Sequence, residues 1–336
     1  MREIFVLPAE RRARTGGNLY NRNLIAALTE HGADIATMTL EQATRHARTA
    51  RPARYWIDML LMDRVRSLRE ATSVDSRVFL IVHWYPSLQP ALASRQRASL
   101  RRREAAAFAA VQGFLVTSRW SAKELAKRGV RRKPVLLVPP APVVTPSRFI
   151  PRDPATLRAA MVAHVIPGKG ILELLRTLAA CMPRASEFSL EIAGSMEVDP
   201  AYAARCRAVS ERPALHGKVR FAGALDARAL ARLYERNAFF VSASHMETFG
   251  MALQEASGFG LYLMVLDAGN TASHVRRGAG EIFDSIEALA ERFCELAREP
   301  EERSRLLRRM PAPSPAPTWP DAARRFLAQR PRGSTA

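Results

Sequence analysis

The chain has few cysteines, and it lacks long hydrophobic runs and clusters of metal ligands. Its three cysteines, Cys181, Cys206 and Cys294, lie far apart in helix-like segments. We therefore expect reduced core thiols in a cytoplasmic protein, with no disulfide, metal ion or other cofactor. No run of 18 apolar residues occurs, so we expect no membrane-spanning helix, and the short apolar part of the N-terminus predicts a first strand rather than a signal peptide.

The dinucleotide-binding fingerprint G-x-G-x-x-G is also absent, which disfavours a dehydrogenase. The glycines near the start are instead the adjacent pair Gly16 and Gly17. Because glycines let a backbone approach a ligand closely, we interpret this pair as a loop at the floor of a binding cleft. An ordinary turn at the start of a helix is the alternative.

Lysine is rare, and most of the positive charge comes from arginine. The chain has 51 Lys and Arg against 32 Asp and Glu, a net charge of +19. Residues 1–150 hold 26 basic and 11 acidic residues, whereas the remainder holds 25 and 21. Such an asymmetry concerns partners rather than fold, and it favours an anionic partner for the first half. No nucleic-acid-binding module is recognisable, so we expect no nucleic acid partner.

Two segments concentrate this charge, residues 51–71 and residues 94–106. The first mixes arginines with Tyr55, Trp56 and Ile57, a composition typical of a helix that lies on an anionic membrane surface. A core-facing helix with a solvated basic side is the alternative. The segment favours a cytoplasmic protein that also binds peripherally to the inner face of the membrane.

Short apolar strands alternate with helical stretches along the chain, which predicts α/β domains with doubly wound parallel sheets. Proline-rich stretches at residues 139–154 and 311–317 divide the series. The expected units are residues 1–148, residues 149–318, and a final helix with its tail, residues 319–336. The expected strands are Ile4–Leu7, Ile35–Leu40, Val78–His83, Phe114–Thr117, Val135–Val138, Ala160–Val165, Phe188–Ala193, Val219–Phe221, Ala238–Ser242 and Tyr262–Leu266.

In the second half, residues 161–175 combine a strand, a turn and a helix. His164 follows the strand, Lys169 and Gly170 form the turn, and apolar residues at helical spacing follow. A lysine at such a junction suits a diphosphate, because the helix N-terminus presents unpaired N–H groups to the same space. A solvated turn lysine is the alternative.

The segment HMETFGMALQEA, residues 245–256, places Glu247 and Glu255 eight positions apart around a Phe-Gly pair. A strand-like run precedes it, and a helix follows that we expect Thr248 to cap. Two carboxylates beside a helix N-terminus suit a ligand with hydroxyls at both ends and phosphates between them, as in a nucleotide-sugar. Two solvated glutamates at an ordinary turn are the alternative.

Together these segments resemble the retaining glycosyltransferases of family 4, which have the GT-B fold. The resemblance covers most of the chain, from the Gly16-Gly17 turn to TWPDAARRF near the end, and the paired glutamates with Phe-Gly are its specific part. It implies two Rossmann-like domains that face a cleft, the first on the acceptor side and the second binding the donor. A C-terminal helix is then expected to cross back to the first domain.

The resemblance implies that a sugar moves, without a metal ion, from a UDP-, GDP- or ADP-sugar to a hydroxyl acceptor such as a glycan or a lipid-linked molecule. In the family an Arg and a Lys hold the donor diphosphate. Lys169 matches the Lys, and His164 stands where the Arg is usual. Glu247 matches the residue that binds the sugar, and Glu255 matches the one that binds the ribose. The implied donor-binding residues are Gly16, Gly17, His164, Lys169, Glu247, Phe249, Gly250 and Glu255.

Two histidines bear on the activity. Arg is permanently charged, whereas His is often neutral near pH 7, so His164 favours one alternative function: a catalytically weak nucleotide-sugar-binding or partner subunit of the same fold. His83 ends a strand whose carboxyl edge is expected to face the cleft. By resemblance it joins Lys169 and Glu247 as a catalytic candidate, and a buried, hydrogen-bonded His is the alternative. Since no side-chain base is evident, the departing phosphate is expected to take the acceptor proton.

Overall fold

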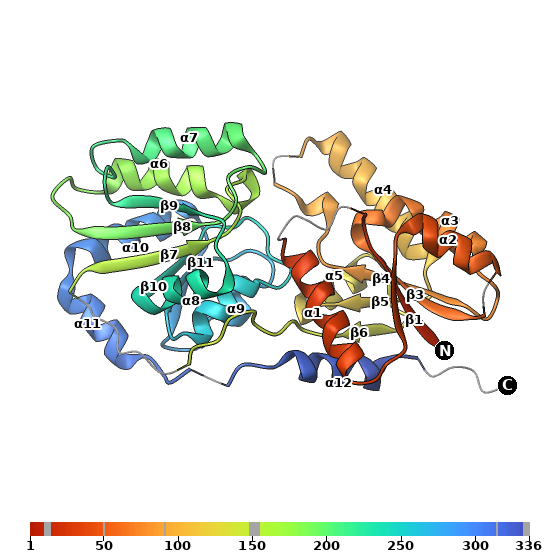
Figure 1. The fold of residues 1–336 in the computed structure, drawn as a ribbon. Coiled ribbons are helices and arrows are strands. Elements are labelled where there is room, and N and C mark those ends of the chain that lie inside the picture. The colour runs from red at the N-terminus through yellow and green to blue at the C-terminus, as the bar shows by residue number, and fades with distance from the viewer. Residues whose placement is uncertain (10–14, 50, 91, 148–154, 314, 332–336) are drawn as a thin grey trace. The chain divides into compact units, whose positions relative to one another are not determined.

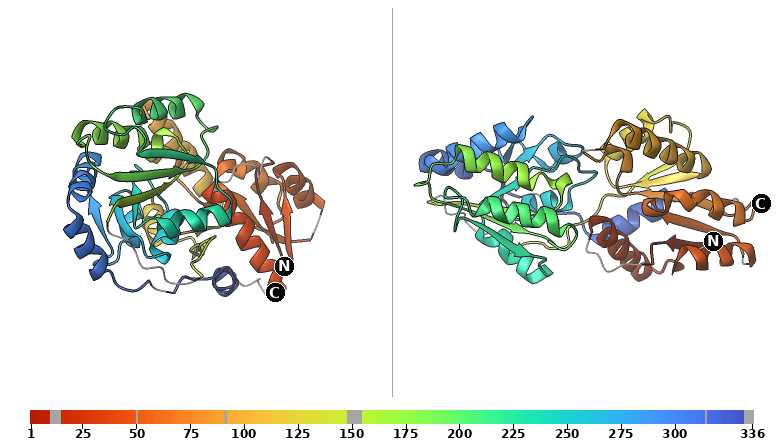
Figure 2. Two further views of the ribbon diagram at one scale, coloured as in Figure 1. Left: turned by 60° about the vertical axis from the view of Figure 1, so that its left-hand side comes forward. Right: turned by 90° about the horizontal axis from the view of Figure 1, so that it is seen from above.

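The computed structural model describes residues 1–9, 15–49, 51–90, 92–147, 155–313 and 315–331. The chain forms two compact units: unit 1 is Met1–Ala141 with Pro317–Ala336, and unit 2 is Pro142–Ala316. Each unit contains a parallel six-stranded sheet with helices on both faces (Figure 1; Figure 2). The predicted class, two doubly wound α/β domains, is confirmed. The expected boundary at residues 148 and 149 and the last five residues of the expected tail lie outside the described residues.

Unit 1 has the strand order β2-β1-β3-β4-β5-β6. The α1 and α12 helices pack on one face of this sheet, and α2, α3 and α4 pack on the other (Figure 1). Its elements are β1 (Arg2–Val6), α1 (Gly16–Glu30), β2 (Ile35–Met38), α2 (Leu40–Thr49), β3 (Ala53–Asp58), the 3-10 helix η1 (Met59–Arg64), α3 (Val65–Ala71), β4 (Arg77–Val82), η2 (Pro86–Leu88), α4 (Ser94–Ala110), β5 (Gly113–Val116), α5 (Arg119–Lys127), β6 (Val135–Leu137) and α12 (Trp319–Gln329).

The strand β3 corrects the sequence analysis. The expected surface helix over residues 51–71 is wrong, because its first part pairs with β1 and β4 inside the sheet, where Trp56 is 0% exposed. A buried carboxylate makes this possible. Glu3 Oε1 lies 2.8 Å from Arg54 Nη2, and Glu3 Oε2 accepts a hydrogen bond of 2.8 Å from Trp56 Nε1. Arg54 and Trp56 are therefore satisfied within the core, and the aromatic part of the run does not face a membrane.

The last helix, α12, belongs to unit 1 although it follows unit 2 in sequence. Phe326 packs at 4.8 Å between ring centroids from Trp56, and Gln329 accepts a hydrogen bond of 2.9 Å from the Leu137 backbone. The expected return of the C-terminal helix to the first domain is therefore confirmed.

Unit 2 has the strand order β12-β11-β10-β7-β8-β9. The α6, α7 and α10 helices pack on one face of the sheet, and α8 and α9 pack on the other (Figure 1). Its elements are β7 (Leu157–Val162), η3 (Pro167–Lys169), α6 (Ile171–Cys181), β8 (Phe188–Ala193), α7 (Pro200–Ser210), β9 (Val219–Gly223), α8 (Ala227–Arg236), β10 (Phe239–Ser242), α9 (Met251–Gly258), β11 (Tyr262–Leu266), η4 (Thr271–His274), β12 (Gly280–Phe283), α10 (Ile286–Arg298) and α11 (Pro300–Arg309).

The cysteines differ from expectation. Cys181, at the end of α6, and Cys294, in α10, form a disulfide with their Cα atoms 6.6 Å apart, while Cys206 is a free, buried thiol. The expectation of three reduced thiols is therefore wrong. The two bonded cysteines are 113 positions apart, and only the packing of α6 beside α10 brings them together.

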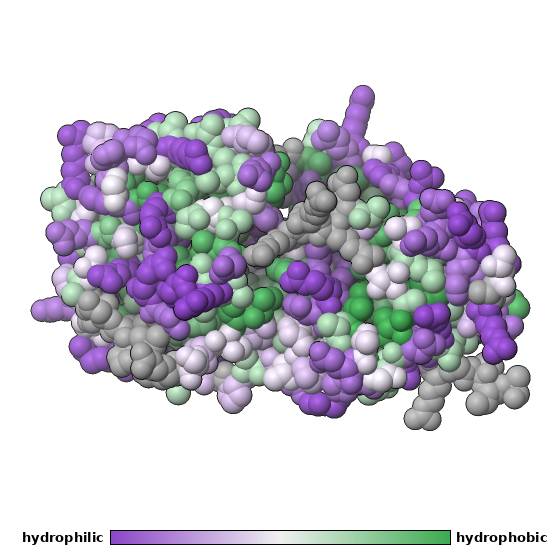
Figure 3. All heavy atoms as spheres, viewed as in Figure 1, coloured by the Kyte–Doolittle hydropathy of each residue, from purple (hydrophilic) through white to green (hydrophobic). Residues whose placement is uncertain are grey.

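The surface carries most of the charge. Figure 3 shows hydrophilic residues spread over both units, with hydrophobic residues between them. On α4, Arg95, Arg101 and Arg102 are all exposed. No helix within the described part of the chain is both long enough and apolar enough to cross a membrane.

Candidate functional site

Two loops meet at the carboxyl ends of neighbouring strands in unit 2. Because β7 pairs in parallel with β10, the loop that follows each strand lies at the same edge of the sheet. One loop leads through η3 into α6, and the other leads into α9. A backbone hydrogen bond of 3.1 Å from His245 N to Gly168 O joins the loops directly. This edge is where doubly wound sheets bind ligands.

Glycine is required in both loops. Gly170 has φ +63°, and a Cβ atom there would lie 2.1 Å from the Ala243 carbonyl oxygen, so the backbones touch. Gly250 has φ +93° and occupies the N-cap position of α9. The expected Thr248 cap is therefore wrong. A left-handed turn at Gly250, which a β-branched residue adopts poorly, sends the chain into the helix.

The joined loops bring Lys169 and Glu247 together. Lys169 Nζ lies 2.5 Å from Glu247 Oε1, and both side chains are partly exposed, at 23% and 20%. The Glu247 backbone is fixed by the segment after β11, because Asn270 N donates to Glu247 O at 2.7 Å. An ammonium group and a carboxylate therefore stand side by side at the start of two helices, where they can hold an anionic group and a hydroxyl group.

Phe249 is held by two residues that the sequence analysis missed. Its carbonyl oxygen accepts hydrogen bonds from Asn270 Nδ2 at 2.9 Å and from His274 Nε2 at 2.6 Å. Burial lowers the pKa of His274, although its bond to Phe249 and the charge of Glu247 act in the opposite direction. Both residues closely follow the expected strand Tyr262–Leu266, and this position at the sheet edge was the available signal.

Glu255 lies in α9 but turns away from solvent. It is 4% exposed, its Oε1 accepts a hydrogen bond of 2.9 Å from Val143 N, and its Oε2 accepts one of 3.0 Å from Tyr234 Oη. Burial raises the pKa of Glu255 to about 7, although these bonds and one from the Val144 backbone lower it. A ribose hydroxyl must therefore reach a carboxylate that is almost fully buried and already accepts hydrogen bonds from Val143, Val144 and Tyr234.

His164 lies in the loop after β7, five residues before Lys169, and is partly exposed. The backbone on either side of it is fixed, since Ala163 N donates to Ala193 O at 2.9 Å and Val165 N donates to Ser195 O at 3.0 Å. The Lys169–Glu247 ion pair does not include it.

Unit 1 holds the other expected residues. Gly16 and Gly17 are the first residues of α1, whose N-cap Thr15 accepts a hydrogen bond from Asn18 N. A Cβ atom on Gly17 would lie 3.2 Å from His83 Cδ2, so the first turn of α1 packs against the imidazole. The structure thus brings Gly17 and His83 together at the carboxyl edge of this sheet.

Two further residues contact His83. Its Nε2 lies 3.3 Å from Asp58 Oδ2 and 3.1 Å from Asn21 Oδ1. Sequence reasoning missed both residues. It placed residue 58 within a helix, whereas Asp58 ends a strand beside β4.

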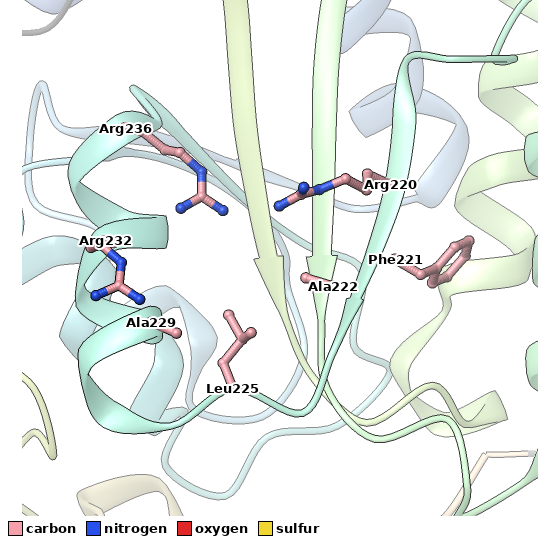
Figure 4. Close-up of a pocket in the computed structure, with 7 residues that line it drawn as sticks. All are labelled: Arg220, Phe221, Ala222, Leu225, Ala229, Arg232 and Arg236. Carbon is pink, nitrogen blue, oxygen red and sulfur yellow. The ribbon is translucent and has the colours of Figure 1, made fainter.

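A separate groove of about 380 Å³ lies between β9 and α8. Figure 4 shows that three arginines, Arg220, Arg232 and Arg236, line it together with Phe221, Ala222, Leu225 and Ala229. Glu191 pairs with Arg236 at 2.6 Å and with Arg220 at 2.8 Å. No expected site residue lines this groove. Among the described residues, no group of three or more His, Cys, Asp and Glu side chains could hold a metal ion.

Comparisons with known proteins concern the family and the fold. Residues 149–310 match the family model described as glycosyl transferases group 1. A sequence comparison with curated proteins finds no match. Sucrose-phosphate synthase from Thermosynechococcus elongatus is similar in structure, with a TM-score of 0.72 at 18% identity over 98% of this chain and 95% of that one.

Two further solved structures have the same fold. The lipopolysaccharide outer core galactosyltransferase WaaB superposes with a TM-score of 0.68 at 14% identity, over 98% of this chain and 99% of that one. HepE from Anabaena, in complex with UDP, gives 0.67 at 15% identity, over 98% and 95%. Residues 149–310 thus match the glycosyl transferases group 1 model, and the chain as a whole has the GT-B fold of these solved glycosyltransferases.

Proposed function

We propose that the protein is a retaining, metal-independent glycosyltransferase of family 4, which transfers a sugar from a nucleotide-diphospho-sugar to a hydroxyl acceptor. The observation that carries this proposal is the Lys169–Glu247 pair, 2.5 Å apart at the mouths of α6 and α9. A cation for a diphosphate and a carboxylate for sugar hydroxyls stand together, as a sugar joined to a phosphate requires.

In the proposed reaction, Lys169 moves from Glu247 to the donor phosphate. The bond between the anomeric carbon and the diphosphate oxygen breaks, and Lys169 with the N–H groups at the start of α6 stabilises the charge on the leaving oxygen. The acceptor oxygen bonds to the anomeric carbon on the same face, and its proton passes to the leaving diphosphate. The products are the glycosylated acceptor and the nucleoside diphosphate.

Glu247 and Glu255 take different parts in this proposal. Once Lys169 turns to phosphate, the Glu247 oxygens accept hydrogen bonds from the sugar. Glu255 binds the ribose by exchanging one of its present bonds, to Val143 N or Tyr234 Oη, for a ribose hydroxyl. Phe249 and Gly250 place the α9 N-terminus beside the phosphates.

We propose a UDP-sugar as the first donor to test, because HepE is described in complex with UDP and with UDP and glucose. Calorimetric titration with UDP, GDP and ADP, and then with their sugars, tests this choice. A nucleotide-sugar that is bound and hydrolysed slowly without an acceptor would support the transferase. If the protein binds none of these nucleotides and none of their sugars, the proposal is wrong.

The alternative function is a catalytically weak nucleotide-sugar-binding or partner subunit. His164 favours it, because an imidazole replaces the permanent charge that the family usually places there. Binding of a nucleotide-sugar with neither transfer nor hydrolysis would support this alternative.

The acceptor side is proposed from charge. The exposed arginines of α4 can bind an anionic membrane surface, which we propose as a partner. The protein would then be cytoplasmic and peripheral to the membrane, and it would act on a lipid-linked or glycan acceptor. Trp56 takes no part in this proposed membrane contact, because its side chain is buried.

A further inference from the structure

Three residues from three elements of unit 1 meet at one point. Asp58 ends β3, Asn21 lies in α1, and His83 follows β4. Asn21 Nδ2 donates to Asp58 Oδ2 at 2.6 Å, and His83 Nε2 lies 3.1 Å from Asn21 Oδ1 and 3.3 Å from Asp58 Oδ2. The carboxylate is 1% exposed and the amide is 2% exposed, so the cluster is shielded from water.

The bonding pattern determines which nitrogen of His83 carries a proton. Asp58 as a carboxylate can only accept, so Asn21 must turn its NH₂ group toward Asp58 and its oxygen toward His83. Two acceptor oxygens then face His83 Nε2, and this nitrogen must donate. Nδ1 is therefore the lone-pair nitrogen of the neutral ring, or the second N–H of the imidazolium.

Hydrogen bonds stabilise the ionised form of Asp58. Asp58 Oδ1 accepts a hydrogen bond of 2.9 Å from Leu60 N. Burial alone would raise the pKa of Asp58, but His83, Leu60 and Asn21 together hold it below its ordinary value. The ring is also fixed from its Cδ2 side by Gly17, and Tyr20 packs against it at 5.3 Å between ring centroids.

We propose that Asn21 and Asp58 are positioning residues, which hold the His83 ring in one orientation with its proton on Nε2. The inference rests on the proposed transferase function, in which His83 is a catalytic residue. Asn21 and Asp58 touch no substrate themselves. They set the orientation and the tautomer of a residue that does, as a buried carboxylate does for the histidine of a hydrolase triad.

The test combines NMR with kinetics on the full chain. In long-range ¹H–¹⁵N spectra, with His83→Gln for assignment, neutral His83 should show the Nε2–H form. In Asp58→Asn the new amide can donate to Nε2, so the Nδ1–H form should appear and kcat should fall at least about tenfold, with the donor KM within about twofold. Asn21→Ala removes one acceptor but leaves the Asp58 carboxylate opposite Nε2, so the Nε2–H form should persist while kcat falls less than in Asp58→Asn. If Asp58→Asn does not fold, Asp58→Ala replaces it, because the Asn21 amide can then turn its NH₂ group toward Nε2 and favour the Nδ1–H form.

Tyr55→Phe is the matched control. Its hydroxyl also bonds a histidine of unit 1, at 2.9 Å from His46 Nδ1, and it lies in the same strand as Asp58. This variant should shift the His46 signals and leave both the His83 tautomer and kcat unchanged.

The outcomes are distinguishable. The Nδ1–H form in the wild-type protein, or an unchanged tautomer in Asp58→Asn, would overturn the inference whatever the activity. A changed tautomer with unchanged kcat would overturn it too, because the cluster would then serve only the core. If no nucleotide-sugar is turned over by the wild-type protein, the proposed function fails, while the tautomer result still decides whether the cluster positions the ring.

Discussion

Lys169 Nζ lies 2.5 Å from Glu247 Oε1, although 78 positions separate the two residues in sequence. The contact exists because β7 and β10 are neighbours in the sheet, so the loops that follow them share one edge. A charge pair that is only partly buried is easily exchanged for a ligand, and this distinguishes it from the buried Arg54–Glu3 pair of unit 1.

The first prediction concerns this lysine. Lys169→Met should lower kcat/KM for the donor by about 100-fold, because a charge that stabilises the leaving phosphate is lost. The melting temperature should change little, since partly exposed ion pairs contribute only about 0.2–1 kcal/mol. Lys218→Met is the control, because Lys218 donates to the Arg184 carbonyl oxygen at 2.7 Å and lies over the Phe188 ring, and it has no part in the proposed donor site. Equal kcat/KM in the two variants would contradict the assignment.

Substitution of Glu247 and substitution of Glu255 should affect the binding of different ligands. Glu247→Gln should leave the affinity for UDP unchanged and weaken the affinity for the UDP-sugar, because only the sugar reaches Glu247. Glu255→Gln should weaken both ligands, because the ribose is common to them. Calorimetric titration of each variant with each ligand measures the difference, and a loss of UDP affinity in Glu247→Gln alone would reverse the roles.

The stability of the folded protein should depend on the titration of Glu255. Its pKa is about 7 when folded, above the ordinary value, so the protonated form is favoured by folding. The contribution is fully present below the unfolded pKa, near 4.5, and is lost as the pH rises through 7. At about 1.36 kcal/mol per pKa unit, this amounts to about 3 kcal/mol.

Denaturation of Glu255→Gln between pH 4.5 and 8 checks the sign, because this variant should lack that decline. Glu191→Gln is the matched control. Hydrogen bonds from Arg236 lower the pKa of Glu191, so its stabilising effect is present at neutral pH and lost on acidification. An identical pH profile in wild type and Glu255→Gln would show that the carboxyl is not titrating in this range.

His164→Arg should strengthen donor binding. A charge-assisted bond to the diphosphate contributes about 1.5–3 kcal/mol, which corresponds to a gain of about tenfold or more in affinity. Loss of binding on gaining the arginine would instead show that the loop after β7 has a different shape, and would favour the weak partner subunit.

Membrane binding should depend on α4. The double variant Arg101→Glu with Arg102→Glu should co-sediment less with vesicles that contain anionic lipid, because each basic residue near such a surface contributes about 1 kcal/mol. Binding of the wild type should also fall as salt shortens the Debye length from about 10 Å at 0.1 M to about 3 Å at 1 M. Arg228→Glu with Arg232→Glu, in the other unit, is the control. Equal recovery with neutral vesicles would favour a soluble acceptor.

Much of the fold was predictable, because buried strands and amphipathic helices have local signatures. The expected strands Phe188–Ala193 and Tyr262–Leu266 match β8 and β11 residue for residue, and the apolar spacing after Gly170 correctly indicated α6. The misread strand β3 shows the limit. Arginine beside tyrosine and tryptophan resembles a surface helix until Glu3, 51 positions away, neutralises Arg54.

The sequence by itself determined the class of the protein, because alternating strand and helix patterns, the Lys-Gly turn and the paired-glutamate loop are each visible in neighbouring residues. Only the tertiary structure decided which of these groups meet. It paired Lys169 with Glu247, enclosed Glu255 against Val143 and Tyr234, bonded Cys181 to Cys294 and gave His83 its partners Asp58 and Asn21. The physical reason is that charge pairing, burial and bond exchange depend on distances across the sheet edge, which strand order fixes and local patterns do not contain.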